Sequence, residues 1–392
     1  MKVKGFFRDL GGAVRVIRAR QKALRTASET PDCADPIGDV AREWHPDVLP
    51  LVVTAIEPAG ASAVTVRLEK VGGGKLPPFY AGQFLSLLFF VDGKPFCRPY
   101  SISSAPFEAR QENGFVEITV RRTGGPVSEY INHGLKTGDR LMGSMGHGQF
   151  CYEPLRDARR IVALAGGTGV TPFVSMAKEI RHRTLDVDLT ILYGSVSPDD
   201  ILLRDALDAL TCDRVHVVHV LSGDAPGWQG ERGYLSAELI GRYAQGDVSY
   251  FICGPQGMYR FVRNELNKLQ VPARRIRFAP FGQAKDIASF PGYPAEKHKE
   301  TYALTVVRGQ RRDCIPARAD ESLVTACERA GILLLTDCRS GECGFCHTKV
   351  LSGDYFVCPE GDGRRAADRK FHYVHACATY PLSDMTIKIP IV

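Results

Sequence analysis

The sequence lacks any stretch long and apolar enough to cross a lipid bilayer. A spanning helix needs about 18 or more consecutive apolar residues, and no such run occurs among the 392 residues. The basic N-terminal stretch also lacks the uninterrupted apolar core and the small-residue cleavage site of a secretory signal peptide. These two absences argue against an integral membrane protein and against a secreted one, so we expect a cytoplasmic protein.

The overall composition is that of an ordinary globular protein, with 44% apolar and 24% charged residues. A chain of this length predicts about two to three domains. The net charge of +6 is modest, and we expect no nucleic-acid partner. Much of that charge comes from the first 26 residues, which hold eight Lys or Arg and one acid, Asp9.

Twelve cysteines without a secretory signal indicate thiols that bind metals rather than form disulfides. Cys338, Cys343 and Cys346 form a C-x4-C-x2-C array, and Cys377 follows after 30 intervening residues. That spacing is typical of a plant-type [2Fe–2S] cluster held by four thiolates. A zinc ribbon would need two C-x2-C pairs, and the sequence has one.

The residues around these thiols suit a cluster loop. Ser340, Gly341 and Gly344 allow a tight fold in which backbone N–H groups point at the sulfurs. His347 has the chemistry to replace a thiolate, as in Rieske centres, but four thiols are already present and we expect it to be a bystander. Three further thiols fall outside the spacing and are expected to be small apolar fillers: Cys314, Cys327 and Cys358.

The pattern of residues predicts a multidomain protein with three folded parts. Residues 1–47 read as a basic amphipathic helix (1–26) and a linker. Residues 48–155 read as an antiparallel β-barrel, and residues 156–283 as an α/β domain with a parallel sheet. After a linker at 284–299, residues 300–392 form a small β-grasp-like α+β unit with one helix near 321–330. The strands expected in the first two parts are 51–56, 63–71, 83–90, 115–121, 161–165, 189–193, 215–221 and 249–253.

Four short motifs, each weak alone, occur in a fixed order before the cysteine array. They are Arg98-Pro-Tyr-Ser101, Gly125-Pro-Val-Ser128, Gly166-Gly-Thr-Gly-Val-Thr-Pro172 and Cys253-Gly-Pro-Gln-Gly-Met258. Together they resemble the landmarks of the ferredoxin reductase superfamily over about residues 50–285. The resemblance implies a flavin barrel and a pyridine-dinucleotide domain, here followed by a C-terminal ferredoxin domain.

The resemblance also implies roles for single residues. Arg98 has a planar fork suited to the flavin phosphate. The Tyr100 ring is expected against the isoalloxazine, the Ser101 hydroxyl near its N5, and the Cys253 side chain near the hydride-bearing carbon; these are the expected catalytic residues. The other expected cofactor-binding residues are Pro99, Gly125, Val127, Ser128, Gly166, Gly167, Thr168, Gly169, Thr171, Pro172, Gly254, Pro255, Met258 and Phe281.

Two departures from the family pattern bear on the cofactors. The segment Tyr193-Gly-Ser-Val-Ser197 has no Arg to match a 2′-phosphate, which favours NADH over NADPH. The segment Phe278-Ala-Pro-Phe-Gly282 lacks the Glu of many relatives, so no carboxylate there is assigned a proton-handling role, and Phe281 is left to shield the flavin ring. The run from Gly138 to Phe150 looks more like the FAD branch than the FMN branch.

These features predict a reductase that passes electrons from nicotinamide to flavin, then to a [2Fe–2S] cluster and on to an external acceptor protein. An oxygenase or another metalloenzyme would suit, and the sequence does not choose between them. Two alternatives are a self-contained reductase of a small molecule such as a quinone, and a redox-responsive binding protein. The basic helix of residues 1–26 suits a cytoplasmic membrane surface or a partner, or else packing on its own protein.

Overall fold

The computed structural model describes residues 6–27, 35–44, 46, 48–279, 282–284 and 286–390, without the side chains of residues 6–10 and 43. The chain divides into two units, Met1–His45 and Pro46–Val392, which are treated separately below. Across the described residues, no helix is both long and apolar enough to cross a membrane.

The N-terminal unit contains two helices, α1 (Phe6–Thr26) and α2 (Pro36–Trp44). The first confirms the helix predicted for this end of the chain. The second shows that the linker prediction for residues 27–47 was wrong over residues 36–44. Asp35 and Pro36 were read as turn formers, but they start a helix: the Asp35 carboxylate accepts the Gly38 N–H at 2.9 Å, and proline is favoured in the first turn.

The first sheet of the large unit is antiparallel, in the order β4-β3-β6-β1-β2-β5. A bridge between Ile102, directly after β4, and Ile118 of β5 joins the two edges, so the sheet curls into the expected barrel. Its interior is filled by apolar side chains such as Leu51, Leu68 and Leu85, which are fully buried. The strands are β1 (Leu49–Pro58), β2 (Ala63–Lys70), β3 (Phe84–Val91), β4 (Lys94–Ser101), β5 (Phe115–Arg121) and β6 (Arg140–His147).

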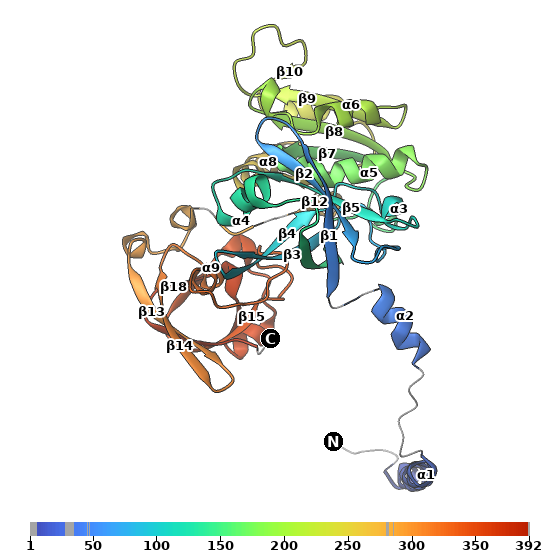
Figure 1. Ribbon diagram of the computed structural model, residues 1–392, viewed down its shortest axis with the longest axis vertical. Coiled ribbons are helices and arrows are strands. Elements are labelled where there is room, and N and C mark those ends of the chain that lie inside the picture. The colour runs from blue at the N-terminus through green and yellow to red at the C-terminus, as the bar shows by residue number, and fades with distance from the viewer. Residues whose placement is uncertain are drawn as a thin grey trace. The chain divides into compact units, whose positions relative to one another are not determined.

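The second sheet is parallel throughout, in the order β10-β9-β8-β7-β11-β12, and helices cover both of its faces (Figure 1). Alternation along β7 explains the two layers: Ile161 and Ala163 pack against α5 and α6, whereas Val162 and Leu164 pack against α7 and α8. The strands are β7 (Arg160–Gly166), β8 (Asp188–Ser195), β9 (Val215–Leu221), β10 (Glu231–Arg232), β11 (Val248–Cys253) and β12 (Ile276–Phe278). The helices are α5 (Thr171–Arg181), α6 (Arg204–Leu210), α7 (Ala237–Tyr243) and α8 (Gln256–Lys268).

The third part has a mixed sheet in the order β14-β13-β19-β15-β17 and a small pair, β16-β18. The predicted helix near 321–330 is α9 (Leu323–Arg329), whose first turn is capped by Ser322. The strands are β13 (Thr301–Arg308), β14 (Arg311–Arg318), β15 (His347–Ser352), β16 (Tyr355–Val357), β17 (Tyr373–His375), β18 (Thr379–Pro381) and β19 (Met385–Lys388), and a short helix α10 spans Ala366–Lys370.

Two details of this part differ from the sequence analysis. The segment expected to be a linker packs onto the third sheet, because Ile287, Phe290 and Tyr293 are buried in its core. Cys314 is exposed, so its assignment as an apolar filler was wrong. It lies on β14, which pairs with β13 only and forms one edge of the sheet; alternation along that strand turns it outward. Cys327 and Cys358 are buried, as expected.

Candidate active site and cluster loop

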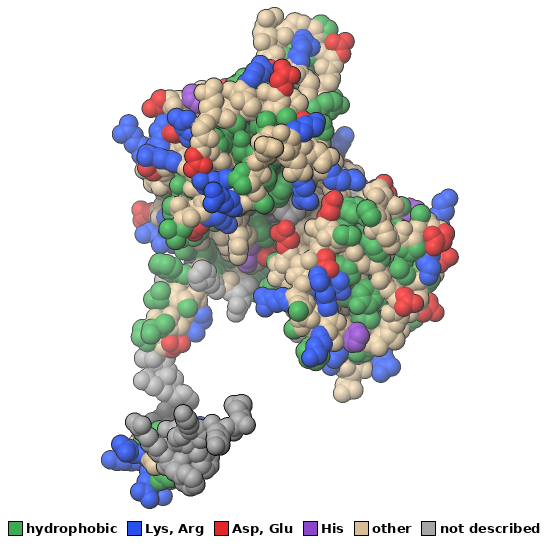
Figure 2. All heavy atoms as spheres, turned by 180° about the vertical axis from the view of Figure 1, so that it is seen from behind, with side chains coloured by type: hydrophobic (Ala, Val, Ile, Leu, Met, Phe, Trp, Pro, Cys, Tyr) green, Lys and Arg blue, Asp and Glu red, His purple; other side chains and the backbone are tan. Residues whose placement is uncertain are grey.

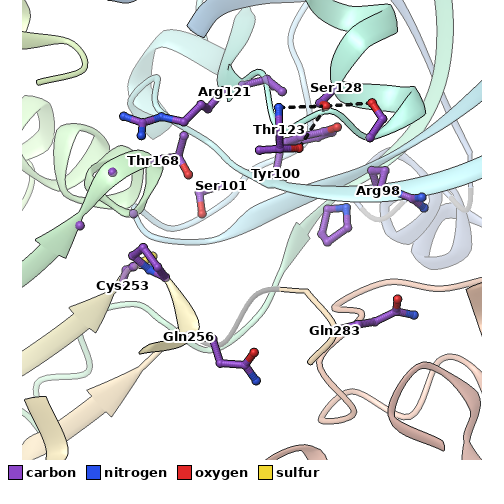
Figure 3. Close-up of a pocket in the computed structure, with 18 of the residues that line it drawn as sticks. Arg98, Tyr100, Ser101, Arg121, Thr123, Ser128, Thr168, Cys253, Gln256 and Gln283 are labelled. Atoms are coloured by element: carbon purple, nitrogen blue, oxygen red, sulfur yellow. Dashed lines mark hydrogen bonds between the residues drawn. The ribbon is translucent and has the colours of Figure 1, made fainter. Parts of the chain in front are cut away.

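A cavity of about 700 Å³ lies where the barrel meets the parallel sheet, and its wall also includes residues that lead toward the third part. The ends of β4, β5, β7 and β11, with the turns that follow the last three, supply most of its lining (Figure 3). Parallel strands place their carboxyl ends at one edge of a sheet, where ligands commonly bind. The predicted site residues in this wall are Arg98, Pro99, Tyr100, Ser101, Gly125, Val127, Ser128, Gly166, Gly167, Thr168, Gly169, Cys253, Gly254 and Pro255.

Three predicted residues lie behind the wall instead of in it. Thr171 and Pro172 are buried in the first turn of α5, where the Thr171 hydroxyl donates to the Thr168 carbonyl oxygen at 2.8 Å. Met258 lies behind Gly166 and Gly254. Phe281 falls outside the described residues, so its expected position against the flavin stays a prediction.

The end of β4 brings aromatic and hydroxyl groups to the cavity. The Tyr100 ring packs edge-on against Phe89, with ring centroids 6.3 Å apart. Burial raises the pKa of the Tyr100 phenol above its usual range, so the ring is neutral at physiological pH. Ser101, Thr168 and Cys253 lie around one end of the cavity, and Arg98 lies toward the other (Figure 3).

Hydrogen bonds of the Ser128 hydroxyl fix the conformation of the Gly125–Ser128 turn. The Ser128 hydroxyl accepts the Thr123 N–H at 3.2 Å and donates to the Gly125 carbonyl oxygen at 2.9 Å. A short helix, α4 (Pro126–Glu129), begins directly after Gly125. N–H groups in a first helical turn have no partner within the helix, so this turn can present them to an anion.

The Gly166–Gly169 turn runs against the end of β11 so closely that a side chain would not fit. A Cβ on Gly169 would lie 2.1 Å from the Cys253 carbonyl oxygen, and one on Gly166 would lie 2.7 Å from the Met258 sulfur. The fully buried Tyr193 fixes the turn, because its hydroxyl donates to the Gly167 carbonyl oxygen at 3.0 Å. Beside the Thr168 side chain, the turn therefore presents backbone to the cavity, as a close approach to a phosphate requires.

Cys253 is 3% exposed, and burial raises the pKa of its thiol to about 12. The side chain is therefore a neutral thiol at physiological pH. Tyr259, which the sequence analysis missed, sets the turn that follows. Its hydroxyl accepts the Gly254 N–H at 3.2 Å and donates to the Ala279 carbonyl oxygen.

Sequence reasoning also missed several charged and polar residues of the wall. Arg121 binds Asp200 at 2.8 Å, and its buried Nε has no hydrogen-bond partner among the described atoms. A signal was present, since Arg121 ends a strand just before the Gly125 turn. Asp286 also lines the cavity. A carboxylate therefore does reach this region, although the segment from Phe278 to Gly282 contains none. The other additions are Thr119, Val120, Thr123, Pro126, Gln256, Gly257, Arg260 and Gln283.

The four predicted cluster thiols come together in one place. Hydrogen bonds link the Cys338 thiol with Cys343 and Cys377, and the Cys346 thiol with Cys377. Donation by these neighbours lowers the pKa of Cys338 below its usual range. No three His, Cys, Asp or Glu side chains in the described part of the chain surround a single ion position. A [2Fe–2S] cluster places only two thiolates on each iron, so the two observations are compatible.

The backbone of the cluster loop points N–H groups at these sulfurs. The Ser340 and Cys343 N–H groups donate to Cys338 Sγ at 3.4 Å, and the Phe345 N–H donates to Cys343 Sγ at 3.4 Å. Gly341 has a φ of +86°, and a Cβ there would lie 1.8 Å from a neighbouring carbonyl oxygen, so only glycine fits. Cys338 is buried, whereas Cys343 and Phe345 are exposed.

His347 is occupied by other contacts. Its Nε2 lies 2.8 Å from an Asp368 carboxylate oxygen, and its ring stacks on Tyr373 with centroids 4.3 Å apart. These contacts agree with the expectation that it is not a ligand.

The cluster loop docks on β4, the strand that carries the first motif. The Cys97 thiol donates to the Thr336 carbonyl oxygen at 2.9 Å, and Arg339 donates to the Cys97 carbonyl oxygen at 3.4 Å. Arg98, expected to bind a flavin phosphate, lines the cavity but also forms an ion pair with Glu328 of α9 at 2.7 Å. Sequence spacing gave no sign of this second partner, 230 residues away.

The residues present fit the expected cofactors. Two glycine-containing turns and the buried, unsatisfied Nε of Arg121 suit the phosphates of a flavin and a dinucleotide. The converging thiols, with N–H donors to sulfur, suit iron.

Comparison with known protein families finds matches to three parts of the chain. Residues 67–152 match the oxidoreductase FAD-binding domain, residues 163–264 the oxidoreductase NAD-binding domain, and residues 307–382 the 2Fe-2S iron-sulfur cluster binding domain. The matches confirm the expected cofactors: FAD, a pyridine dinucleotide and a [2Fe–2S] cluster.

Several relatives are similar over most of their length. The glycine betaine monooxygenase reductase subunit of Pseudomonas aeruginosa is 27% identical, over 79% of this chain and 87% of its own. Ferredoxin–NADP reductase B of Sorangium cellulosum is 34% identical, over 57% of this chain and 93% of its own. The structure of phthalate dioxygenase reductase, a modular protein for electron transfer from pyridine nucleotides to [2Fe–2S], superposes with a TM-score of 0.63, over 91% of this chain and all of that one, at 22% identity.

The chain thus matches all three domain models and covers 93% of a ferredoxin–NADP reductase that is 34% identical to it. The chain belongs to the ferredoxin–NADP reductase family of oxidoreductases, in a form that carries a C-terminal [2Fe–2S] domain.

Proposed function

We propose that this protein is the reductase component of a two-protein system: it takes electrons from NADH and hands them singly to a separate oxygenase. The observation that carries this proposal is the double role of β4. One end of the strand lines the cavity through Tyr100 and Ser101, and Cys97 contacts the cluster loop. Relatives named as monooxygenase reductase subunits support the choice of partner.

Bound flavin supplies the conversion of a two-electron donor into a one-electron donor, which the side chains cannot supply. The chain contributes placement. Ser101 offers a hydroxyl and Cys253 a neutral thiol at the same end of the cavity, and both come from the ends of strands that the sheets hold rigid. The Tyr100 ring adds an apolar surface to the cavity wall.

The phosphate groups are assigned to three features. The first motif and the Gly125–Ser128 turn would hold the flavin, with Arg98 on its phosphate, and the Gly166–Gly169 turn would hold the dinucleotide. The four converging thiols, Cys338, Cys343, Cys346 and Cys377, would hold the cluster. The corresponding domains are 48–155, 156–283 and 300–392, joined by the segment 284–299.

The preference for NADH rests on the end of β8. Ser195 and Val196 offer no cation. The cation nearest in register is Arg232 of β10, because Leu221 of β9 pairs with Ser195 on one side and with Arg232 on the other. The Arg232 guanidinium already donates to the carbonyl oxygens of Ala225 at 2.7 Å and Trp228 at 3.3 Å. Both bonds come from Nη2, and they hold the guanidinium against the turn that contains Ala225 and Trp228.

The function is tested with purified protein and candidate oxygenase components. NADH should bleach the flavin under anaerobic conditions, a paramagnetic [2Fe–2S] signal should follow, and substrate turnover should require both proteins. Flavin bleaching without a cluster signal would contradict the electron path. A cluster signal without turnover by any oxygenase would contradict the partner class.

The first helix supports a second proposal, docking on an anionic membrane on its cytoplasmic face. Residues 11–26 are all exposed and carry five cations and no acid, and blue side chains mark this end of the chain in Figure 2. Val14 and Ile17 lie exposed among them, at 43% and 55%. A basic helix with an apolar stripe suits the lipid headgroup region.

A further inference from the structure

One buried carboxylate joins two arginines from different parts of the molecule. Glu328 lies near the end of α9, and its side chain is 5% exposed. It accepts hydrogen bonds from Arg98 at 2.7 and 3.1 Å and from Arg339 at 2.5 and 3.2 Å. A buried carboxylate needs such partners, and two guanidinium forks satisfy both of its oxygens.

The two arginines mark the two sides of the boundary between barrel and cluster loop. Arg98 belongs to β4 and lines the cavity, whereas Arg339 directly follows the first predicted cluster ligand, Cys338. Both guanidinium groups also donate to one backbone atom, the Cys97 carbonyl oxygen, at 2.9 and 3.4 Å. In Figure 1, α9 lies against the edge of the barrel near β3 and β4.

Other polar contacts across this boundary, among the described residues, lie at Thr336 and Asp337. The Cys97 thiol donates to the Thr336 carbonyl oxygen at 2.9 Å, and the Ser86 hydroxyl donates to the Asp337 carboxylate. The Thr336 hydroxyl also donates to the Cys97 carbonyl oxygen at 3.5 Å, and the Asp337 carboxylate lies 3.6 Å from Nδ1 of His147. Glu328 instead constrains two planar side chains at once, one on each side, and so restricts rotation as well as separation.

We infer that Glu328 is a positioning residue for electron transfer between the flavin part and the cluster: it holds residues 336–339 against β4. This inference rests on the proposed function. It adds a residue that touches neither cofactor site itself and acts through Arg98 and Arg339. Transfer needs a short, fixed separation, so loosening this contact should slow the cluster's reduction without stopping reduction of the flavin.

The test uses full-length protein with flavin and cluster bound, and compares Glu328→Gln with wild type. After anaerobic mixing with NADH, the rate of flavin bleaching and the rate of appearance of the cluster's paramagnetic signal are measured separately. We expect the second rate to fall about tenfold or more relative to the first, which corresponds to about 1.4 kcal/mol of lost docking free energy. Amide hydrogen exchange should rise at residues 336–339 and 96–99. Because Glu328→Asp keeps the carboxylate, it should change both the rate ratio and the exchange less than Glu328→Gln does.

Glu321 provides the matched control. It is also a buried carboxylate of the third part, 4% exposed, but its partner, Arg329 at 2.6 Å, belongs to the same part. Glu321→Gln should leave the ratio of the two rates and the exchange at 96–99 unchanged. An equal fall in that ratio in Glu321→Gln would overturn the inference, because the effect would be general destabilisation.

Three other results decide the question. Glu328→Gln with full cofactor content, an unchanged rate ratio and unchanged exchange contradicts the positioning role. Loss of the cluster in both Glu328 variants also contradicts it, since the residue would then only be needed to fold the loop. Wild-type protein in which NADH bleaches the flavin but never reduces the cluster would contradict the proposed function itself.

Discussion

Replacing Arg98 by Ala should weaken flavin binding and loosen the cluster loop, and the two losses can be separated. Arg98 lines the cavity and pairs with Glu328, and its side chain is 22% exposed. Loss of charged hydrogen bonds to a phosphate costs about 2–4 kcal/mol. At 1.4 kcal/mol for each factor of ten, flavin should dissociate with a Kd about 30- to 700-fold higher.

The loss at Glu328 should be smaller than that of an ordinary broken ion pair. Removing one partner of a buried pair costs about 3–5 kcal/mol, because a charge is left unpaired. Here Glu328 keeps Arg339 at 2.5 Å, so we expect about 1.5–3 kcal/mol, the value of the charged hydrogen bonds alone. Arg98→Lys should recover part of the contact with the flavin phosphate but little of the bidentate contact with Glu328.

The assay is titration of flavin-free protein with FAD, followed by protein fluorescence. Arg67→Ala is the control, since Arg67 pairs with Glu117 on the same barrel at 2.8 Å and is absent from the cavity wall. A double-mutant cycle with Glu328→Gln then separates the two roles. A loss of flavin affinity that disappears in the Glu328→Gln background would show that Arg98 acts through Glu328. An unchanged Kd in Arg98→Ala would refute the phosphate role.

Four further predictions concern other parts of the molecule. Cys343→Ser should abolish the paramagnetic cluster signal while NADH still bleaches the flavin, and Cys358→Ser should keep both; a cluster that survives in Cys343→Ser would contradict the ligand assignment. In steady-state assays kcat/KM should be higher for NADH than for NADPH, and a tenfold preference for NADPH would reverse the choice of nucleotide. Burial raises the pKa of Cys253 to about 12 from 9.0, so the unfolded chain loses this proton first and the free energy of unfolding should fall as pH rises above about 9; a Tm that falls equally in Cys253→Ser would assign the slope to other groups. Removing residues 1–26 should abolish salt-sensitive binding to anionic vesicles and leave ferricyanide reduction intact, and a lower Tm with unchanged vesicle binding would disprove membrane docking.

Much of the fold could be predicted from local patterns. The strands at 115–121 and 215–221 begin and end where the runs of β-branched residues do, because each run is bounded by turn-forming or charged residues. Helix α2 was missed because Asp35 and Pro36 favour both turns and helix starts. The helix start is visible in the structure from the contacts that Asp35 makes with the N–H groups of Gly38 and Asp39.

The site was predictable to the extent that it consists of contiguous motifs. Glycines whose Cβ would collide with another backbone, such as Gly169, stand in a short contiguous motif, residues 166–172. The pairing of Arg98 with Glu328 and the hydrogen bonds of Tyr259 depend on how segments far apart in the chain meet. Arg, Glu and Tyr are common on protein surfaces, so their residue type alone did not single them out.

One side of the cluster loop is buried against the barrel and the other is exposed to solvent. This difference determines from which side another protein can approach the cluster. Cys338 is buried beside the residues that touch the barrel, whereas Cys343 and Phe345 face solvent. An acceptor protein that approaches the outer side meets the cluster without meeting the flavin. In the proposed function, the surface around Phe345 is therefore the place where a partner protein would collect single electrons.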